Sequence, residues 1–114
     1  MLHERIFVFE LGSRGPYAVV TATGEIDIAA VDDLCGAIRR AARRGPRVVV
    51  DLRPVTFMDT FALRALVDLQ REARTAHDWS LHVVAGESRC LQRLLDLAGA
   101  RDDLHWISPE QLAG

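Results

Sequence analysis

Polar side chains stand at the points where predicted strands give way to predicted helices. Asp59 and Thr60 follow Met58 directly and precede a helical pattern of apolar residues. A carboxylate or hydroxyl in that place can accept a hydrogen bond from an unpaired backbone N–H at the helix start. Asp27 stands in the same relation to an earlier helix. Spacing alone therefore favours helix-capping roles for these side chains over any other chemistry.

The strand that leads toward Asp59 is a run of three valines at residues 48–50. The run shows no alternation of polar and apolar residues, which is typical of a strand buried on both faces between parallel neighbours. Asp51 ends it, and Pro54 prevents the ladder from simply continuing. Phe57 and Met58 are then expected to return the chain to the core.

The other elements alternate along the chain. Apolar patterns and turn residues predict strands at residues 6–9, 17–22, 81–85 and 104–107, and helices at residues 30–44, 61–76, 88–98 and a short one from 109. Two strands followed by helix–strand units predict an α/β fold, a single domain over residues 1–114 with a mixed sheet of about four to five strands and helices packed against it. Thr60 would lie just past a strand's carboxyl end, where ligand and regulatory groups gather in open α/β sheets.

Length and composition restrict the class of protein. The 114 residues are 49% hydrophobic, which suits one globular domain. No apolar run approaches the ~20 residues needed to span a bilayer, and the first five residues lack a signal-peptide pattern. We therefore expect a cytoplasmic protein with no direct membrane insertion.

The charged residues exclude several kinds of chemistry. The net charge is -2, so no overall field attracts nucleic acid. All 14 basic residues are arginine, and without lysine there is neither a P-loop lysine nor a Schiff-base lysine. Cys35 and Cys90 are expected to be buried free thiols, and no metal-ligand spacing or cofactor motif is present. The sequence thus argues against phosphate chemistry carried out by this chain alone and against a bound metal or cofactor.

Two motifs resemble those of STAS domains, the family of the bacterial anti-sigma-factor antagonists. The family pattern has Asp-Leu, a short gap and then Val-x-Phe-Met/Ile-Asp-Ser-Ser/Thr-Gly-Leu. In this sequence it stands as Asp51-Leu52, then Val55-Thr56-Phe57-Met58-Asp59-Thr60-Phe61-Ala62-Leu63. The second family motif, Gly-Glu-Leu/Ile-Asp, stands here as Gly24-Glu25-Ile26-Asp27.

The resemblance implies a function and a set of site residues. Thr60 would be the phosphoacceptor, and the partner-binding residues would be Glu25, Asp27, Asp59, Thr60, Phe61 and Arg64. The partner would be an anti-sigma factor with serine/threonine kinase activity, bound by the unphosphorylated form so that a sigma factor is released. Phosphorylation of Thr60 would end the binding, and a phosphatase acting on Thr60 would restore it.

Two other hypotheses remain at this stage. Phe61 replaces the second hydroxyl residue of the pattern and Ala62 replaces its glycine, which favours a non-phosphorylated STAS scaffold or a subunit of a stress-signalling or membrane-transport complex. A receiver domain with Asp51 as phosphoacceptor would need a lysine and a second acid beside Glu10, and both are missing. The sequence leaves both a monomer and a weak dimer open.

Overall fold

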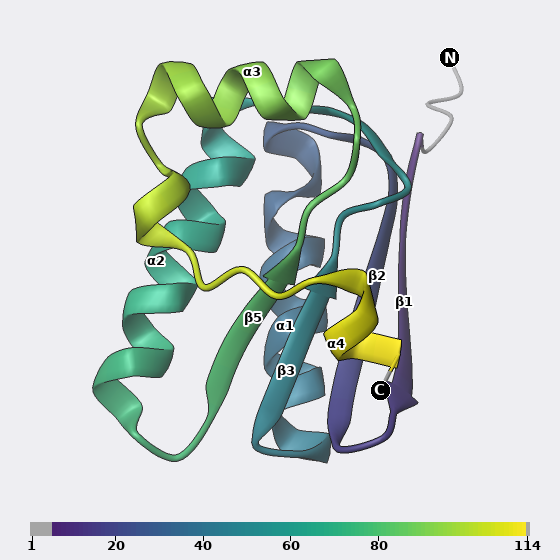
Figure 1. The fold of residues 1–114 in the computed structure, drawn as a ribbon, viewed down its shortest axis with the longest axis vertical. Coiled ribbons are helices and arrows are strands. Elements are labelled where there is room, and N and C mark those ends of the chain that lie inside the picture. Colours follow the sequence, from purple (N-terminus) through teal and green to yellow (C-terminus); the bar gives the residue numbers. More distant parts are fainter. Residues whose placement is uncertain (1–5, 114) are drawn as a thin grey trace.

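A mixed sheet of five strands carries four α-helices in residues 6–113, the part of the chain that the computed structural model describes (Figure 1). The elements in order are β1 (Phe7–Arg14), β2 (Tyr17–Ile26), the 3₁₀ turn η1 (Ile28–Ala30), α1 (Val31–Arg44), β3 (Arg47–Asp51), β4 (Val55–Met58), α2 (Thr60–Ala76), β5 (Ser80–Val84), α3 (Arg89–Ala98), the 3₁₀ turn η2 (Arg101–Asp103) and α4 (Pro109–Ala113). The predicted α/β fold with a mixed sheet is confirmed.

The strand order is β1-β2-β3-β5, and β4 also pairs with β2. The β1–β2 hairpin is antiparallel, and the pairings of β2 with β3, β2 with β4 and β3 with β5 are parallel. β2 is long enough to pair with β3 along its first half and with β4 near its end, and the β2–β4 pairing shifts register at a bulge between Gly24 and Glu25. This second pairing brings the end of β4, and therefore the start of α2, beside the end of β2.

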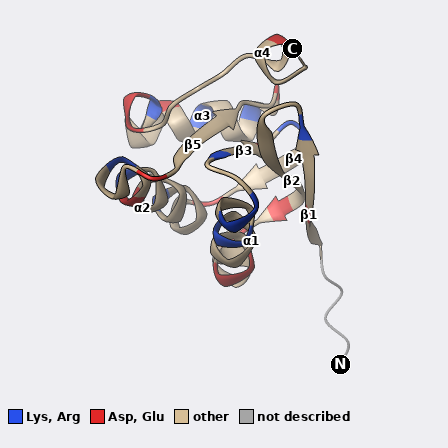
Figure 2. Ribbon diagram, turned by 90° about the horizontal axis from the view of Figure 1, so that it is seen from below, with Lys and Arg blue, Asp and Glu red and all other residues tan. Residues whose placement is uncertain are grey.

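The two faces of the sheet are covered differently. α1 and α2 lie on one face, while α4 and the segment before it cross the other (Figures 1 and 2). The larger core lies on the helix side, and the smaller one joins Val19, Val49 and Val84 to Ile107 and Leu112. α3 crosses one end of the sheet (Figure 1) and contacts β4 there.

Helix α1 shows how the charge pattern suits local structure. Asp32 and Asp33 lie in its first turn, and Arg43 and Arg44 lie in its last. This order complements the partial charges at the two helix ends. Figure 2 shows the acidic and basic residues at opposite ends of this helix.

Several sequence predictions need correction. The segment Val55–Met58 is a strand, and Phe57 on it is 39% exposed although we expected it in the core. Residues 104–107 form no full strand, since only a single bridge joins Trp106 to Val83. Cys90 is exposed because Leu91 and Leu95 carry the buried stripe of α3. Strand pairing between distant segments decides the first two cases, whereas the helical phase of α3 decides the exposure of Cys90.

Candidate functional site

Asp59 is the residue that holds the candidate site together. It is the N-cap of α2, where its Oδ1 accepts a hydrogen bond from the Ala62 N–H at 2.9 Å. Its Oδ2 accepts a second hydrogen bond, from the Ile28 N–H at 3.0 Å. One carboxylate therefore satisfies an unpaired donor at the start of α2 and fixes the η1 turn against it. The capping role expected from spacing is confirmed.

Asp27 has the corresponding role one element earlier. Its Oδ1 accepts a hydrogen bond from the Ala29 N–H at 3.0 Å, which caps the η1 turn rather than α1 itself. Because the Ile28 N–H donates a hydrogen bond to Asp59, the segments that contain Asp27 and Asp59 lie together at the same end of the sheet. Glu25 is exposed on β2, and its register partner on β4 is Phe57. The structure thus brings Glu25, Asp27 and Asp59 onto one surface.

Thr60 is the first residue of α2, and its side chain is exposed. Within residues 6–113 the Thr60 hydroxyl has no hydrogen-bond partner. The first backbone N–H groups of a helix have no intrahelical acceptor, so negative charge is favoured at this position. The hydroxyl is therefore open to a modifying group in surroundings that tolerate an anion.

Exposed apolar side chains surround this position. Ile28 is 60% exposed, Phe57 39% and Phe61 58%. They flank Asp59 and Thr60 along the chain or, for Ile28, through its hydrogen bond to Asp59. We call these three residues the apolar rim. Sequence reasoning missed Ile28 and Phe57, because an isolated isoleucine carries no surface signal and Phe57 was assigned to the core. A cluster of exposed apolar groups is typical of a protein-binding surface.

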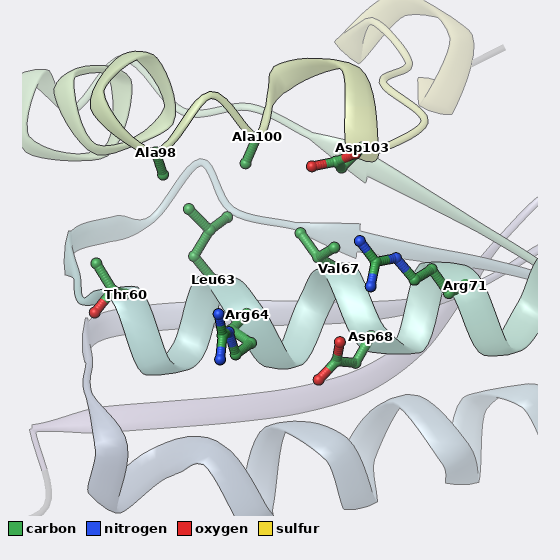
Figure 3. A pocket seen from close by; sticks show the side chains of 9 residues that line it. All are labelled: Thr60, Leu63, Arg64, Val67, Asp68, Arg71, Ala98, Ala100 and Asp103. Carbon is green, nitrogen blue, oxygen red and sulfur yellow. The ribbon is translucent and has the colours of Figure 1, made fainter.

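Thr60 also opens onto a groove between α2 and the chain that follows α3 (Figure 3). The groove has a volume of about 590 Å³ and is lined by Thr60, Leu63, Arg64, Val67, Asp68, Arg71, Ala98, Ala100 and Asp103. Leu63, Val67 and Ala100 are buried and form its apolar floor. Of the predicted site residues, Thr60 and Arg64 line this groove, whereas Phe61 lies outside it.

Asp51, the acceptor of the receiver hypothesis, is occupied by a structural ion pair. It is 6% exposed, and its Oδ2 accepts a hydrogen bond from the Arg53 Nη2 at 2.8 Å. Its Oδ1 accepts from the Arg53 backbone N–H and from Nε, each at 3.0 Å. Burial by itself would raise the pKa of Asp51, but these hydrogen bonds and the arginine charge outweigh burial and lower the pKa. The carboxylate therefore stabilises the turn after β3.

Comparison with known proteins identifies the family to which this chain belongs. The family model described as "Mlab, STAS domain" matches residues 10–107, so the chain belongs to the STAS-domain family. No curated protein sequence matches the chain. Among the residues described, no helix has the length and apolar character needed to cross a membrane.

Solved structures of low sequence identity share the fold. An anti-sigma factor antagonist from Mycobacterium paratuberculosis is 22% identical, with a TM-score of 0.72 over 90% of this chain and 86% of that one. SpoIIAA, another anti-sigma factor antagonist, is 18% identical in its unphosphorylated form, with a TM-score of 0.69 over 91% of both chains. The phosphorylated form of Bacillus SpoIIAA has a TM-score of 0.62 at 18% identity, over 91% of this chain and 95% of that one.

A transporter contains the same fold as one part of a much longer chain. The murine anion transporter Slc26a9 is 14% identical to this chain, with a TM-score of 0.63. The match covers 86% of this chain and 17% of the transporter. The STAS fold therefore occurs both in small antagonists and within a transport protein.

Proposed function

We propose that this chain is an anti-sigma-factor antagonist. Its apolar rim, which includes Phe61, and the carboxylates of Glu25, Asp27 and Asp59 would bind an anti-sigma factor, with Thr60 and Arg64 as further contacts. The observation that carries the proposal is the exposed Thr60 hydroxyl at the first position of α2, set among exposed apolar side chains. Binding by the unphosphorylated form would release a sigma factor in the cytoplasm.

Phosphorylation of Thr60 would end the binding. The Thr60 Oγ1 would attack the γ-phosphorus of ATP held by the anti-sigma factor, and the bond from that phosphorus to the β,γ-bridging oxygen would break. ADP would leave, and a base of the kinase would take the hydroxyl proton. The kinase supplies ATP and Mg²⁺ in this scheme, so the present chain is a substrate and a binding protein, not a catalyst.

The physical effect of the phosphate follows from its charge and position. It adds about -1.5 to -2 charges beside the three carboxylates. The helix start can accommodate that charge, so the fold is retained. The binding surface, however, becomes more anionic and bulkier, and each 1.4 kcal/mol of lost binding free energy weakens affinity about tenfold. Hydrolysis of the phosphate by a phosphatase would restore the binding form.

The proposal can be tested with four forms of the full chain used to capture proteins from the native cell extract. These are the wild type, Thr60→Ala, Thr60→Glu and the control Thr75→Glu, which makes the same change at the other end of α2. We expect wild type, Thr60→Ala and Thr75→Glu to capture a kinase-type anti-sigma factor, and Thr60→Glu to lose it. Intact-mass analysis of the recovered wild type should show a phosphate on Thr60. Equal capture by all four forms, without phosphate, would refute the proposal.

A second candidate function is a non-phosphorylated scaffold or subunit of a membrane-transport complex. It is supported by the fold shared with the Slc26a9 anion transporter and by Phe61 and Ala62 at two positions of the family pattern. In that case Thr60→Ala and Thr60→Glu would capture the same partners. Variants of the apolar rim, such as Phe61→Ser, would lose them.

A further inference from the structure

Arg64 lies one helical turn after Thr60, and both side chains line the groove beside α2 (Figure 3). Residues four apart on a helix are neighbours, with about 5–6 Å between their Cβ atoms. The long arginine side chain is exposed, so it can turn along the helix without displacing packed groups. Any group attached to the Thr60 hydroxyl therefore lies within reach of the Arg64 guanidinium.

The Arg64 guanidinium has no competing partner among residues 6–113. Arg39, Arg53 and Arg101 form ion pairs with carboxylates, but Arg64 forms no ion pair or hydrogen bond within the described part of the chain. Asp68, one turn further along α2, is the nearest acid by helical spacing and lines the same groove. The geometry thus leaves Arg64 free to respond to a charge at Thr60.

We propose that Arg64 clamps the phosphate of phosphorylated Thr60, an inference that rests on the proposed function. The planar guanidinium presents paired N–H donors that match two phosphate oxygens, and such charge-assisted bonds are among the stronger hydrogen bonds in proteins. The phosphate carries more negative charge than the Asp68 carboxylate, so it attracts the Arg64 guanidinium more strongly. Arg64 therefore moves toward the start of α2 when Thr60 is modified.

This movement changes the groove as well as the helix start. In the unmodified chain Arg64 and Asp68 contribute opposite charges to the middle of the groove. In the phosphorylated chain the arginine is held at Thr60, and Arg71, one turn further along α2, becomes the nearest groove-lining cation to Asp68. A partner group that used Arg64 in the groove would lose that contact at the same time as it met the phosphate. The clamp thus extends the effect of one phosphate along about two turns of α2.

The test uses the full chain with phosphothreonine incorporated at position 60 during synthesis, so that no native kinase is needed. The second pKa of the phosphate is measured by ³¹P NMR titration at low salt in wild type, Arg64→Gln and the control Arg71→Gln. Arg71 lines the same groove about three turns from Thr60. We expect the phosphate pKa to be about 0.5 higher in Arg64→Gln than in wild type, because a nearby cation favours the dianion. Arg71→Gln should match wild type.

An unchanged phosphate pKa in Arg64→Gln would overturn the clamp. An equal rise of the phosphate pKa in Arg71→Gln would also overturn it, because the rise would then reflect the summed charge of the groove and not a contact with Arg64. Because the phosphate is installed chemically, this result does not depend on whether cells modify Thr60. Absence of phosphate on the recovered wild-type chain would instead refute the proposed function. The two failures are therefore distinguishable.

Discussion

Replacing Asp59 with alanine should destabilise the chain more than the loss of an ordinary surface carboxylate would. The Asp59 carboxylate accepts from the Ala62 N–H at 2.9 Å and from the Ile28 N–H at 3.0 Å. Alanine removes both acceptors at once. It therefore breaks the cap of α2 and also the link between α2 and the η1 turn.

The size of the effect can be worked from these two bonds. Loss of an N-cap side chain typically costs about 1 kcal/mol. A hydrogen bond to a charged acceptor contributes about 1.5–3 kcal/mol, but Ile28 is exposed and water can replace its partner, so we take about 1 kcal/mol for that bond. The free energy of unfolding of Asp59→Ala should thus fall by about 2 kcal/mol. For a domain of this size the Tm should fall by roughly 8 °C.

The assay is equilibrium urea unfolding of wild type, Asp59→Ala, Asp59→Ser and Asp27→Ala. Serine can cap α2 but is too short to reach Ile28 as well, so Asp59→Ser should lose about half as much as Asp59→Ala. Asp27→Ala removes a single cap bond and should cost about 1 kcal/mol. A loss below about 0.5 kcal/mol in Asp59→Ala would refute the view that this carboxylate joins the two elements. Equal losses for serine and alanine would show that the cap contributes nothing.

Three further predictions concern positions away from Thr60. Gly24 has φ +95°, and a Cβ there would lie 1.9 Å from a backbone oxygen beside the start of β1, so Gly24→Ala should cost at least about 2 kcal/mol in thermal unfolding; near wild-type stability would contradict this. The pKa of Asp51 is lower in the folded chain than its unfolded-state value of about 3.8, so the ionised carboxylate stabilises the fold above that pH. This stabilisation is lost as pH falls through the folded-state pKa. Asp51→Asn should be less stable than wild type near neutral pH, but its free energy of unfolding should fall less steeply in acid. Burial and the neighbouring His105 lower the pKa of His82 below 6.5, so the free energy of unfolding should fall as pH drops through 6.5. His105→Gln should raise the His82 pKa in an NMR titration. An unchanged His82 pKa would exclude the contribution of His105.

Local signals predicted the helix ends well because capping depends on a few adjacent residues. Ser88 caps α3 through a hydrogen bond from the Leu91 N–H, as its place before an apolar stripe indicates. Ser108 and Gln111 form a reciprocal capping box, with bonds of 2.8 and 3.2 Å. The cap at Asp59 follows the same rule. These interactions form within one turn of chain, so the sequence contains everything needed to infer them.

The candidate site was harder to predict because its surface forms from distant segments. Phe57 is exposed because β4 pairs with the end of β2 after a bulge, and no local pattern reports that register. The groove beside Thr60 has Ala98, Ala100 and Asp103 on its far side, about 40 residues along the chain. Spacing on α2 can place Thr60 and Arg64 on one helix face, but it cannot show what lies opposite. The positions of Thr60 and Arg64 on one helix face were therefore predictable, whereas the shape of the surface around them was not.

The two departures from the family pattern have different physical consequences. Ala62 is fully buried and donates its N–H to Asp59, and alanine in a helix is about 1 kcal/mol more favourable than glycine. Alanine at position 62 therefore stabilises the start of α2 relative to glycine. Phe61 is 58% exposed and does not line the groove, so its ring leaves the groove side of Thr60 open. A partner that binds this surface must instead provide an apolar contact for Phe61, where the family pattern would present a hydroxyl. The departures thus bear on which partner is recognised more than on whether Thr60 can be reached.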